Sequence, residues 1–547
     1  MNRQEHLSRL RNEEFDVCII GAGASGAGTA IDAVLRGYTV ALIDKNDFCA
    51  ETSSKSTKLI HGGVRYLERA FKQLDLEQIR QVRHGLNERH TLLTVAPHLA
   101  KPIALITPVF SWLEGLYYTI GLKIYGLFAI GDSLPSAKWL SKKETLARMP
   151  GLSKKMHSSV LYYDGTLNDA GYTFAMVQSA EKKGAAVANH VSVENFIKDK
   201  EGQIERAVVK DEITHEPFEI KAKLFINCTG PFADSIRLMA EPEEEDRMRP
   251  AKGVHIVFPS ELLPGKDAML IPKTKDGRVI FVKPLGNKVT VGTTDTAYED
   301  MSKEPLLESE EIDYLLETVN PFVEKDLTRK DIVSGFAGVR PLLAPRNIRR
   351  TETKALLRDH EVEHMPASNL LSLLGGKWTT YRVMAKDCMD YADMLFNRND
   401  NSCTTANHML VGAQNEAFDS EVFIEEVSKR FSKETADHLY ENYGDLALEV
   451  LLLVDEDAEL GDKIHEEFPF LMAEVFFAVK YGMASKLRDF FARRIRMEIL
   501  DWRATMSVVD KVAAIFQKEL GWSNEESAAN LKEYLALLDK KIATASI

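Results

Sequence analysis

The feature that most constrains the fold of this chain is a short apolar run that leads directly into closely spaced glycines. The run spans residues 15–20, and the glycines follow in the pattern G-x-G-x-x-G: Gly21, Gly23 and Gly26. Small residues then dominate 25–36, Gly37 follows, and a second apolar run at 38–43 ends in Asp44. This order predicts a βαβ unit, in which two parallel strands flank a helix that ends at a glycine.

Each glycine of this unit has a mechanical role. The first permits a tight turn, the second lets a pyrophosphate approach the backbone, and the third lets the helix pack closely on the strand. The N-terminus of the helix offers N–H groups and the positive end of its dipole to phosphates. Asp44 stands where an acid accepts hydrogen bonds from a ribose. The unit therefore predicts a dinucleotide site, and by itself it does not distinguish NAD from FAD.

A second polar motif follows, ETSSKSTKLIHGGVRYLE at residues 51–68. It supplies short donors that suit phosphate and flavin edges: Ser53, Ser54 and Thr57. Around two adjacent glycines it then offers groups suited to a polar substrate: His61, Arg65 and Tyr66. With the βαβ unit before it, this stretch resembles the FAD-dependent glycerol-3-phosphate dehydrogenases, respiratory enzymes that do not use NAD.

Three later segments resemble the same family and occur in the same order. KLFINCTGPFAD is an apolar strand that ends in Thr229 and Gly230. FAGVRPLLAP places Arg340 before a proline, which favours an extended backbone at the arginine. LLSLLGGKWTTYR predicts a strand, a turn at Gly375 and Gly376, and the start of a helix. The resemblance therefore extends with motifs over residues 15–395.

The resemblance implies FAD as the cofactor and implies site residues at the positions that match the family. FAD contacts are expected at Gly21, Gly23, Ser25, Gly26, Asp44, Lys45, Ser53, Ser54, Thr57, Lys58, Leu59, Val191, Thr229, Gly230, Gly376, Lys377 and Thr379. The active site is expected to contain His61, Arg65, Tyr66, Arg340, Arg358 and Lys377. We expect no metal.

The chemistry of the candidate residues suits a phosphorylated alcohol. Arginine makes forked contacts to phosphate, and lysine supplies a point charge. The hydroxyl at C2 of the substrate must lose a proton as its hydride leaves, and His61 is our candidate base, with His255 as the second candidate. The helix that begins after Gly376 would stabilise the negative charge of a reduced flavin. Lys252 and Thr294 either reach the pocket or lie on the surface of a sheet.

We predict an α/β fold in three parts. A Rossmann-like FAD-binding domain of the glutathione-reductase/D-amino-acid-oxidase type is discontinuous: 1–100, 150–245 and 330–395. A β-rich substrate or cap domain, with a hairpin at Gly286 and Asn287, covers 101–149 and 246–329. Helical spacing of apolar residues predicts a C-terminal α-helical domain at 400–547. Within it, Arg493, Arg494 and Arg496 are expected on a solvated face.

Composition limits the partners and the compartment. The 547 residues carry a net charge of -13, which argues against a nucleic-acid-binding protein. The five cysteines are scattered, which indicates a reducing compartment with neither a disulfide framework nor structural zinc. The first fifteen residues contain no apolar core of a secretory signal, so we expect a cytoplasmic protein.

The most apolar stretch, residues 102–131, has two interpretations. Its interruption by charges and a proline argues against a membrane-spanning helix. It is either a buried helix or a helix or loop that dips into a membrane surface, with aromatic side chains at the level of the headgroups: Trp112, Tyr117, Tyr118 and Tyr125. The second interpretation would place the protein on the inner face of the cell membrane.

The resemblance implies oxidation of sn-glycerol 3-phosphate to dihydroxyacetone phosphate by hydride transfer to FAD, with a membrane quinone as electron acceptor. The close alternative is a glycerol-3-phosphate oxidase that uses oxygen. The resembling oxidases carry an insertion before the GGK motif, and the short segment between Arg340 and Lys377 favours the dehydrogenase. An amine or amino-acid oxidase, and a flavin-binding regulatory protein without turnover, are further alternatives. A homodimer is left open.

Overall fold

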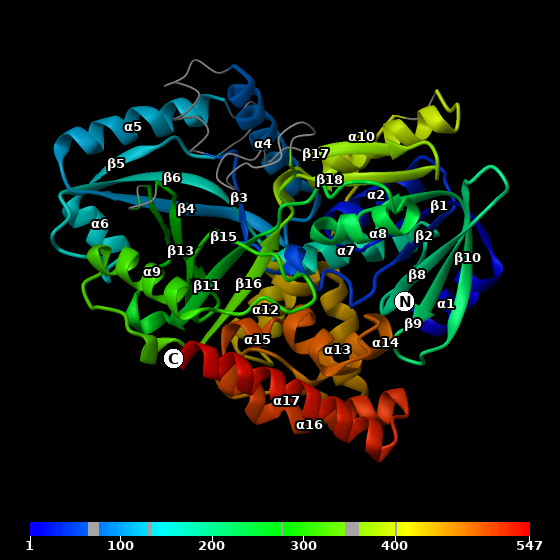
Figure 1. Ribbon diagram of the computed structural model, residues 1–547. Coiled ribbons are helices and arrows are strands. Elements are labelled where there is room, and N and C mark those ends of the chain that lie inside the picture. The colour runs from blue at the N-terminus through cyan, green and yellow to red at the C-terminus, as the bar shows by residue number, and fades with distance from the viewer. Residues whose placement is uncertain are drawn as a thin grey trace.

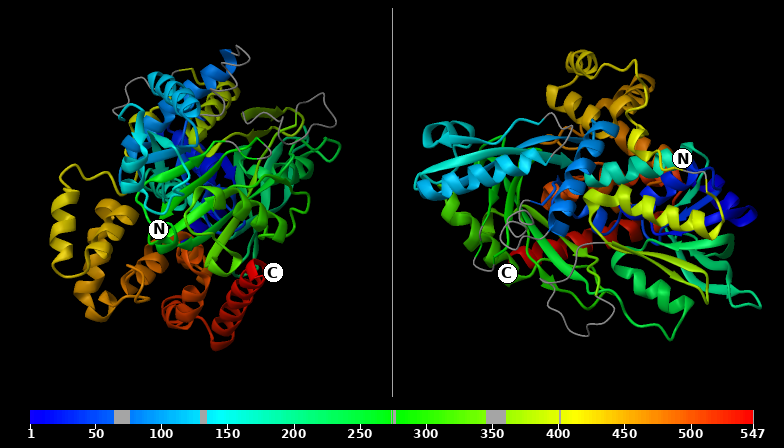
Figure 2. Two further views of the ribbon diagram at one scale, coloured as in Figure 1. Left: turned by 90° about the vertical axis from the view of Figure 1, so that its left-hand side faces the viewer. Right: turned by 90° about the horizontal axis from the view of Figure 1, so that it is seen from above.

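The computed structural model describes residues 1–63, 76–128, 134–272, 274, 277–344, 360–399 and 402–546. These residues form two β-sheets that lie side by side and a group of C-terminal helices below them (Figure 1). Figure 2 shows the first C-terminal helices, coloured yellow to orange, standing out from the body of the molecule. The predicted combination of a Rossmann-like sheet, a second β-rich part and a helical tail is confirmed.

The first sheet has eight strands and contains the predicted βαβ unit. Its strands are β1 (Glu14–Ile20), β2 (Val40–Ile43), β7 (Ala186–Ala188), β8 (Val191–Lys198), β9 (Ile204–Asp211), β10 (Pro217–Asn227), β17 (His360–Met365) and β18 (Leu370–Gly375). The strand order is β17-β18-β10-β1-β2-β7, and β9 joins β8 to β10. The strands from β18 to β7 run parallel, so their carboxyl ends lie along one edge of the sheet.

Helices cover both faces of this sheet: α1 (Arg3–Asn12), α2 (Ala24–Leu35), α7 (Asp169–Lys182), α8 (Ala233–Ala240) and α10 (Tyr381–Leu395). Small side chains let α2 pack closely between the sheet, α7 and α10, and Ala27, Ala30 and Ala33 are fully buried there. Gly37 adopts a φ of 80°, the left-handed conformation that ends a helix. α1 and α8 cover the opposite face.

The second sheet has ten strands and stands beside the first. They are β3 (Leu59–Ile60), β4 (Ala100–Val109), β5 (Lys138–Ser141), β6 (Ser158–Leu167), β11 (Ala251–Pro259), β12 (Ala268–Ile271), β13 (Ile280–Leu285), β14 (Lys288–Gly292), β15 (Thr296–Ala297) and β16 (Ser334–Arg340). The predicted hairpin at Gly286 joins β13 to β14. β6 and β16 lie within the ranges predicted for the FAD-binding domain, but they pair with β4 and β11 of this sheet.

Three further helices lie beside the second sheet and in the segments that join the two sheets: α4 (Leu76–Val95), α6 (Lys142–Arg148) and α9 (Ser309–Val319). The apolar stretch 102–131 is not one buried helix. Its first part is β4, and its second part is α5 (Trp112–Leu127), whose apolar side chains are largely exposed: Trp112, Leu113, Leu116, Tyr117, Ile120 and Leu127. Tyr125 differs from the prediction, because it is buried and its hydroxyl accepts the N–H of Gly62.

None of the helices that the structure describes is both long enough and apolar enough to cross a membrane.

The C-terminal part is helical, as predicted: α11 (Ser420–Ser428), α12 (Lys433–Tyr443), α13 (Ala447–Glu456), α14 (Met472–Tyr481), α15 (Met497–Leu500), α16 (Trp502–Leu520) and α17 (Asn524–Ser546). The prediction of a solvated face is wrong for Arg493 and Arg494, which are buried and bind Asp47 of the first domain.

Asp47, His190 and Asp489 offer ligand atoms within 4.8 Å of one another. Because the arginines already neutralise these carboxylates, we interpret the group as an ion-pair cluster.

Candidate active site

Four predicted motifs meet along the carboxyl edge of the first sheet. Gly21 follows β1, Thr229 follows β10, and Gly376 follows β18, which are adjacent parallel strands. Asp44 follows β2, on the other side of β1. Ligands of open parallel sheets bind in the crevice outside this edge. The topology therefore brings together residues that lie more than 300 positions apart in the chain, as the predicted dinucleotide site requires.

The glycine positions leave no room for side chains. Gly21 has a φ of 98°, and a Cβ there would lie 2.8 Å from the carbonyl oxygen of Cys228. A Cβ at Gly26 would lie 1.8 Å from the carbonyl oxygen of Gly21, so only glycine lets α2 cross β1 this closely. Gly23 caps α2 without a side chain, and the first turn holds no acidic residue. The N-terminus of α2 can therefore receive an anion without a competing negative charge.

Asp44 is partly buried beside this turn. Its carboxylate accepts the N–H of Ala22 at 2.7 Å and the N–H of Asn46 at 3.0 Å. Burial raises the pKa of Asp44 to about 6, although these hydrogen bonds act in the opposite direction. The N–H of Val191 donates to the carbonyl oxygen of Asp44 at 2.7 Å, which places Val191 next to the carboxylate expected to bind the ribose. Lys45 is exposed next to them.

The loop that carries the predicted short donors lies against both the glycine turn and the second sheet. Ser53 accepts the N–H of Ala24 at 2.9 Å, so its hydroxyl stands at the start of α2. The hydroxyl of Thr52 donates to the carbonyl oxygen of Val339 at 2.6 Å. Ser54 is buried and donates to the carbonyl oxygen of Glu51. The loop thus occupies the boundary between the two sheets.

Lys58 points into the protein rather than toward the glycine turn. Its ammonium donates to Asp169 at 2.7 Å and to the carbonyl oxygen of Ser54 at 2.8 Å. Burial lowers the pKa of Lys58, and the charge of Asp169 offsets only part of that effect. Asp169 also accepts the hydroxyl of Ser56 at 2.7 Å. The lysine therefore fixes the shape of the loop, while Leu59 continues into β3 and pairs with Thr166.

The two candidate bases approach the site from different elements. His61 follows β3 and stacks on Phe281 of β13, with ring centroids 5.9 Å apart. His255 of β11 is buried, stacks on Phe336, and lies with Nε2 3.0 Å from the hydroxyl oxygen of Thr57. Burial, followed by the charges of Lys58, Arg340 and Lys283, lowers the pKa of His255 well below its ordinary value. His255 is therefore neutral near pH 7, and His61 is the more accessible of the two.

Arg340 ends β16 at the same boundary. Its guanidinium donates to the carbonyl oxygen of Thr294 at 2.9 Å and lies 3.3 Å from the carboxylate of Asp295. Thr294 itself is buried and donates to Glu311, and Lys252 is buried in ion pairs with Glu311 and Glu308. The side chains of Lys252 and Thr294 are therefore buried against the second sheet and are not exposed on its surface.

The GGK motif forms the turn that the sequence predicts. Gly375 and Gly376 adopt φ values of 73° and 85°. Lys377 is half-buried at the start of a short 3-10 turn, and its carbonyl oxygen accepts the N–H of Thr380 at 3.1 Å. Thr379 is buried in that turn, directly before α10. At β10, Thr229 donates to Asn227 and Gly230 adopts a φ of 56°.

Three predicted active-site residues, Arg65, Tyr66 and Arg358, lie outside the described residues.

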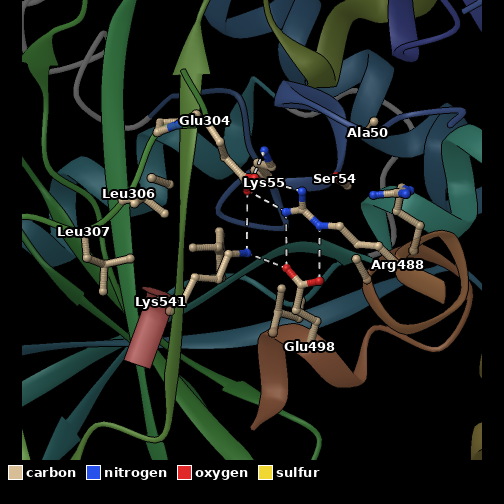
Figure 3. A pocket seen from close by; sticks show the side chains of 16 residues that line it. Ala50, Ser54, Lys55, Glu304, Leu306, Leu307, Arg488, Glu498 and Lys541 are labelled. Carbon is tan, nitrogen blue, oxygen red and sulfur yellow. Dashed lines mark hydrogen bonds and ion pairs between the residues drawn. The ribbon is translucent and has the colours of Figure 1, made fainter. Parts of the chain in front are cut away.

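Charged side chains connect the loop that carries Ser53, Ser54 and Thr57 to the rest of the protein (Figure 3). Lys55 of the loop and Arg488 and Lys541 of the C-terminal part surround the carboxylate of Glu304. Arg488 and Lys541 also bind Glu498. Burial raises the pKa of Glu498, but these two cations bring it down to about 2. The network therefore fixes the loop against the C-terminal helices.

Sequence reasoning missed three residues that shape the site. Asp169 holds Lys58 and Ser56 from 111 and 113 positions away, and Phe281 and Phe336 support the two histidines. The signal for Asp169 was its place at the start of a helix, which is also a common capping position. No local pattern distinguishes the two phenylalanines from ordinary core residues.

Comparisons with known proteins agree with this geometry. The model of the family described as FAD dependent oxidoreductase matches residues 16–375, and that of the C-terminal domain of alpha-glycerophosphate oxidase matches residues 403–527. The probable mitochondrial glycerol-3-phosphate dehydrogenase of Caenorhabditis elegans is 39% identical over 99% of this chain and 75% of its own length. The chain belongs to the FAD-dependent glycerol-3-phosphate dehydrogenase family.

Other members of this glycerol-3-phosphate dehydrogenase family support the assignment. The mitochondrial enzyme of Bos taurus is 36% identical over 97% of this chain and 74% of its own length. The crystal structure of the glycerol-3-phosphate dehydrogenase from Bacillus halodurans, complexed with FAD, superposes with a TM-score of 0.79. It is 28% identical and covers 100% of this chain and 98% of that one.

FAD is the cofactor of this protein, as its family shows, and the residues at the predicted dinucleotide site are suited to bind FAD. Gly23, the second glycine of the motif, begins α2 without a side chain, so a pyrophosphate can approach the backbone there. Asp44 offers a carboxylate at the end of β2. At the end of β18, Gly375 and Gly376 adopt left-handed φ values, and a Cβ at Gly376 would lie 2.4 Å from the sulfur of Met384, so the turn that would face the flavin requires a glycine there.

Proposed function

We propose that this flavoenzyme oxidises sn-glycerol 3-phosphate to dihydroxyacetone phosphate and passes the electrons to a membrane quinone. The observation that carries the proposal is the contact between Thr57 and His255 at 3.0 Å. It joins the loop of the expected FAD contacts Ser53, Ser54 and Thr57 to the sheet that carries Arg340, so Arg340 and His255 belong to the element that contacts the residues that would hold FAD. FAD, when bound, supplies the acceptor for a hydride.

We assign the cofactor contacts as follows. The N-terminus of α2 and Ser53 bind the pyrophosphate, Asp44 binds the ribose, and Val191 lies against the adenosine. Thr57 and the backbone of Gly376, Lys377 and Thr379 hold the flavin end. The remaining expected contacts are part of the same proposal: Gly21, Gly23, Ser25, Gly26, Lys45, Ser54, Lys58, Leu59, Thr229 and Gly230. For Lys58 this concerns the backbone, because its side chain is bound to Asp169.

The substrate site requires cations for the phosphate and one proton acceptor. Arg340 and Lys377 supply positive charge from two different sheets, and Arg65, Tyr66 and Arg358 complete the proposed set. A phosphate dianion is favoured by such converging donors because charge-assisted hydrogen bonds are strong. His61 takes the proton from the C2 hydroxyl. His255 is less suitable as the acceptor, because its lowered pKa makes it a weak base.

A quinone is dissolved in the bilayer, so the proposed acceptor requires contact with a membrane. α5 offers an apolar surface for this contact: Trp112 is 57% exposed, Leu113 71% and Leu127 79%. An interfacial helix combines such side chains with aromatic residues near the headgroups. We therefore place the protein on the inner face of the cell membrane, attached through α5.

The acceptor is tested by stopped-flow reoxidation of the substrate-reduced enzyme. We expect a short-chain quinone to reoxidise the flavin at least about a hundred times faster than air-saturated buffer, with little hydrogen peroxide. Fast reoxidation by oxygen with stoichiometric peroxide would instead identify an oxidase. A flavin that no phosphorylated polyol reduces would support a binding protein without turnover.

A further inference from the structure

The loop that follows β2, residues 44–49, holds the glycine turn at two points. The carboxylate of Asp44 accepts the N–H of Ala22 at 2.7 Å. Further along the loop, the N–H of Cys49 donates to the carbonyl oxygen of the same alanine at 3.1 Å. Ala22 lies within the glycine motif, where the pyrophosphate is expected to approach the backbone. The conformation of this loop therefore helps to set the shape of the turn that receives FAD.

Asp47 lies between these two contacts and is bound by side chains from the C-terminal part of the chain. Its carboxylate is buried and accepts two hydrogen bonds from the guanidinium of Arg494, at 2.8 and 2.9 Å. The Nε atom of Arg493 donates to the same carboxylate at 2.5 Å. A forked arginine contact fixes the orientation of a carboxylate and also neutralises its charge. The C-terminal part thus holds the loop at a point between its two contacts with Ala22.

Both arginines are themselves fixed by the C-terminal part. The guanidinium of Arg494 donates to the carbonyl oxygen of Gly482, directly after α14, at 2.7 Å. That of Arg493 also donates to Asp489 at 2.7 Å. Both arginine side chains are nearly completely buried. The two guanidinium groups therefore take their positions from the C-terminal part and pass them on to the loop.

The turn between β7 and β8 completes this joint. The side-chain amide of Asn189 donates to Asp47 and to the carbonyl oxygen of Met483, both at 2.9 Å. The N–H of His190 donates to a carbonyl oxygen of the loop at 2.8 Å, and its Nε2 atom lies 2.9 Å from the carboxylate of Asp489. The loop, this turn and the C-terminal part therefore form one buried joint beside the expected FAD contacts.

Electrostatics gives the arginines a second effect on the cofactor site. Burial is the main reason that the pKa of Asp44 is raised to about 6, and the negative charge of Asp47 acts in the same direction. The pyrophosphate of FAD is also negatively charged, so a carboxylate in the adjoining loop would repel it. Arg493 and Arg494 neutralise this carboxylate and so reduce the repulsion.

We propose that Arg494 and Arg493 are positioning residues for FAD. By holding Asp47 they fix the loop around Ala22, so that docking of the C-terminal helices and binding of FAD stabilise each other. Such coupling is reciprocal, because an effect of the C-terminal contact on FAD affinity implies an equal effect of FAD on that contact. The inference rests on the proposed placement of FAD at the glycine turn and Asp44, and it is independent of the substrate and of the electron acceptor.

The affinity of the full-length apoprotein for FAD, measured by flavin fluorescence, tests this role. Arg494→Met keeps a long side chain without its charge and is expected to raise the Kd for FAD at least about tenfold. Lys288→Met is the matched control, because Lys288 is buried and lies 3.5 Å from Asp501, so it joins the C-terminal part to the second sheet. The control should keep the wild-type Kd even where it lowers the melting temperature. Wild-type affinity in Arg494→Met, or an equal loss in both variants, would overturn the proposal.

A double variant shows whether Arg494 acts through Asp47. Asp47→Asn keeps the shape of the side chain and removes the charge that the arginine neutralises. In this background, Arg494→Met should raise the Kd for FAD no more than about threefold further. A further rise of about tenfold would contradict the proposal, because the arginine would then act without this carboxylate.

Asp44→Asn, measured in parallel, separates this inference from the proposed cofactor contacts. An unchanged Kd in that variant would count against the placement of FAD at Asp44. An unchanged Kd in Arg494→Met alone would count against the role of the C-terminal part.

Hydrogen–deuterium exchange of the wild-type protein, with and without FAD, tests the reciprocal effect and needs no variant. We expect FAD to slow exchange at residues 484–496 at least about threefold, although this segment holds no expected FAD contact. Residues 420–428, which form α11, are the internal control and should change less. Slower exchange at the glycine turn, with no difference between these two segments, would overturn the proposal.

Discussion

The Nε2 atom of His255 lies 3.0 Å from the hydroxyl oxygen of Thr57, joining the second sheet to the loop that follows the βαβ unit. A second contact, from Thr52 to the carbonyl oxygen of Val339, reinforces this joint at 2.6 Å. The loop that is expected to bind FAD is therefore positioned by the sheet that is expected to bind substrate. This coupling explains how motifs from distant parts of the chain form one site.

Replacing Gly26 by alanine is expected to prevent normal FAD binding. The new Cβ would lie 1.8 Å from the carbonyl oxygen of Gly21, so α2 must move away from β1. We expect most of the flavin to be lost on purification and the protein to be destabilised by about 1–3 kcal/mol. The ratio of flavin to protein absorbance and urea unfolding measure both effects.

Gly121→Ala is the matched control for this variant. Gly121 lies within α5, and a Cβ there meets no atom within 4 Å. This variant should keep its full flavin content and gain about 0.5–1 kcal/mol from improved helix propensity. A Gly26→Ala protein that retains a full complement of FAD would show that the close crossing of α2 and β1 is not needed.

The affinity of the apoprotein for FAD is expected to fall at acidic pH because of Asp44. The pKa of this carboxyl is raised from 3.8 to about 6 in the folded apoprotein. Ribose hydroxyls donate better to the ionised form, so binding should weaken by up to about tenfold from pH 7 to pH 5. Flavin fluorescence titrations measure this. Asp44→Asn should bind more weakly but without this pH dependence, and an unchanged pH profile in that variant would contradict the assignment.

The same pKa shift fixes the sign of a stability effect in the apoprotein. Between pH 3.8 and about 6 the folded state binds more protons at Asp44 than the unfolded state does. The contribution of Asp44 to the free energy of unfolding should therefore decrease as the pH rises through this window. Comparing urea unfolding of the wild-type apoprotein and Asp44→Asn at several pH values isolates that contribution.

His61→Ala is expected to slow flavin reduction by substrate about a hundredfold or more. The variant is also expected to lose the pH dependence of this rate that a deprotonated base causes. In the wild-type enzyme the rate should rise with pH as the base becomes neutral, and it should be nearly flat in the variant. Anaerobic stopped-flow absorbance measures the rate. His90→Ala, at an exposed position of α4, is the control and should behave like the wild type. Unchanged reduction and pH profile in His61→Ala would exclude His61 as the base.

Charge on the exposed face of α5 is expected to weaken membrane binding. Leu113 and Ile120 are 71% and 51% exposed, and losing the burial of both side chains should reduce vesicle binding at least about tenfold. The double variant with glutamate at both positions is compared with glutamate at Leu448 and Leu452, which are 46% and 59% exposed on α13. Equal loss in both variants, in vesicle co-sedimentation, would mean that α5 is not the contact.

The sequence predicted those parts of the fold that depend on local pattern. The βαβ unit, the extended Arg340 before a proline, the turn at Gly375 and the hairpin at Gly286 each follow from neighbouring residues. The sequence did not predict the position of side chains whose partners lie far away in the chain. Arg494 is buried because Asp47 lies opposite it, 447 positions away, and no helical periodicity shows this. Lys58 turns inward because Asp169 accepts its ammonium, whereas its motif suggested only a cofactor contact.

The apolar stretch 102–131 shows a second kind of limit. Its composition alone indicated either a buried helix or a helix or loop at a membrane surface, and neither interpretation included a strand. In the structure β4 fills the inner part because it pairs with β6 and β12, and only the remainder forms α5. Pairing with distant strands, rather than local propensity, decides such a boundary.

The most direct test of the account is the visible spectrum of the purified holoenzyme, recorded without oxygen before and after addition of sn-glycerol 3-phosphate. We predict prompt bleaching of the oxidised flavin bands, with dihydroxyacetone phosphate formed in an amount equal to the flavin reduced. A bound flavin that stays oxidised in the presence of this substrate would contradict the proposed function.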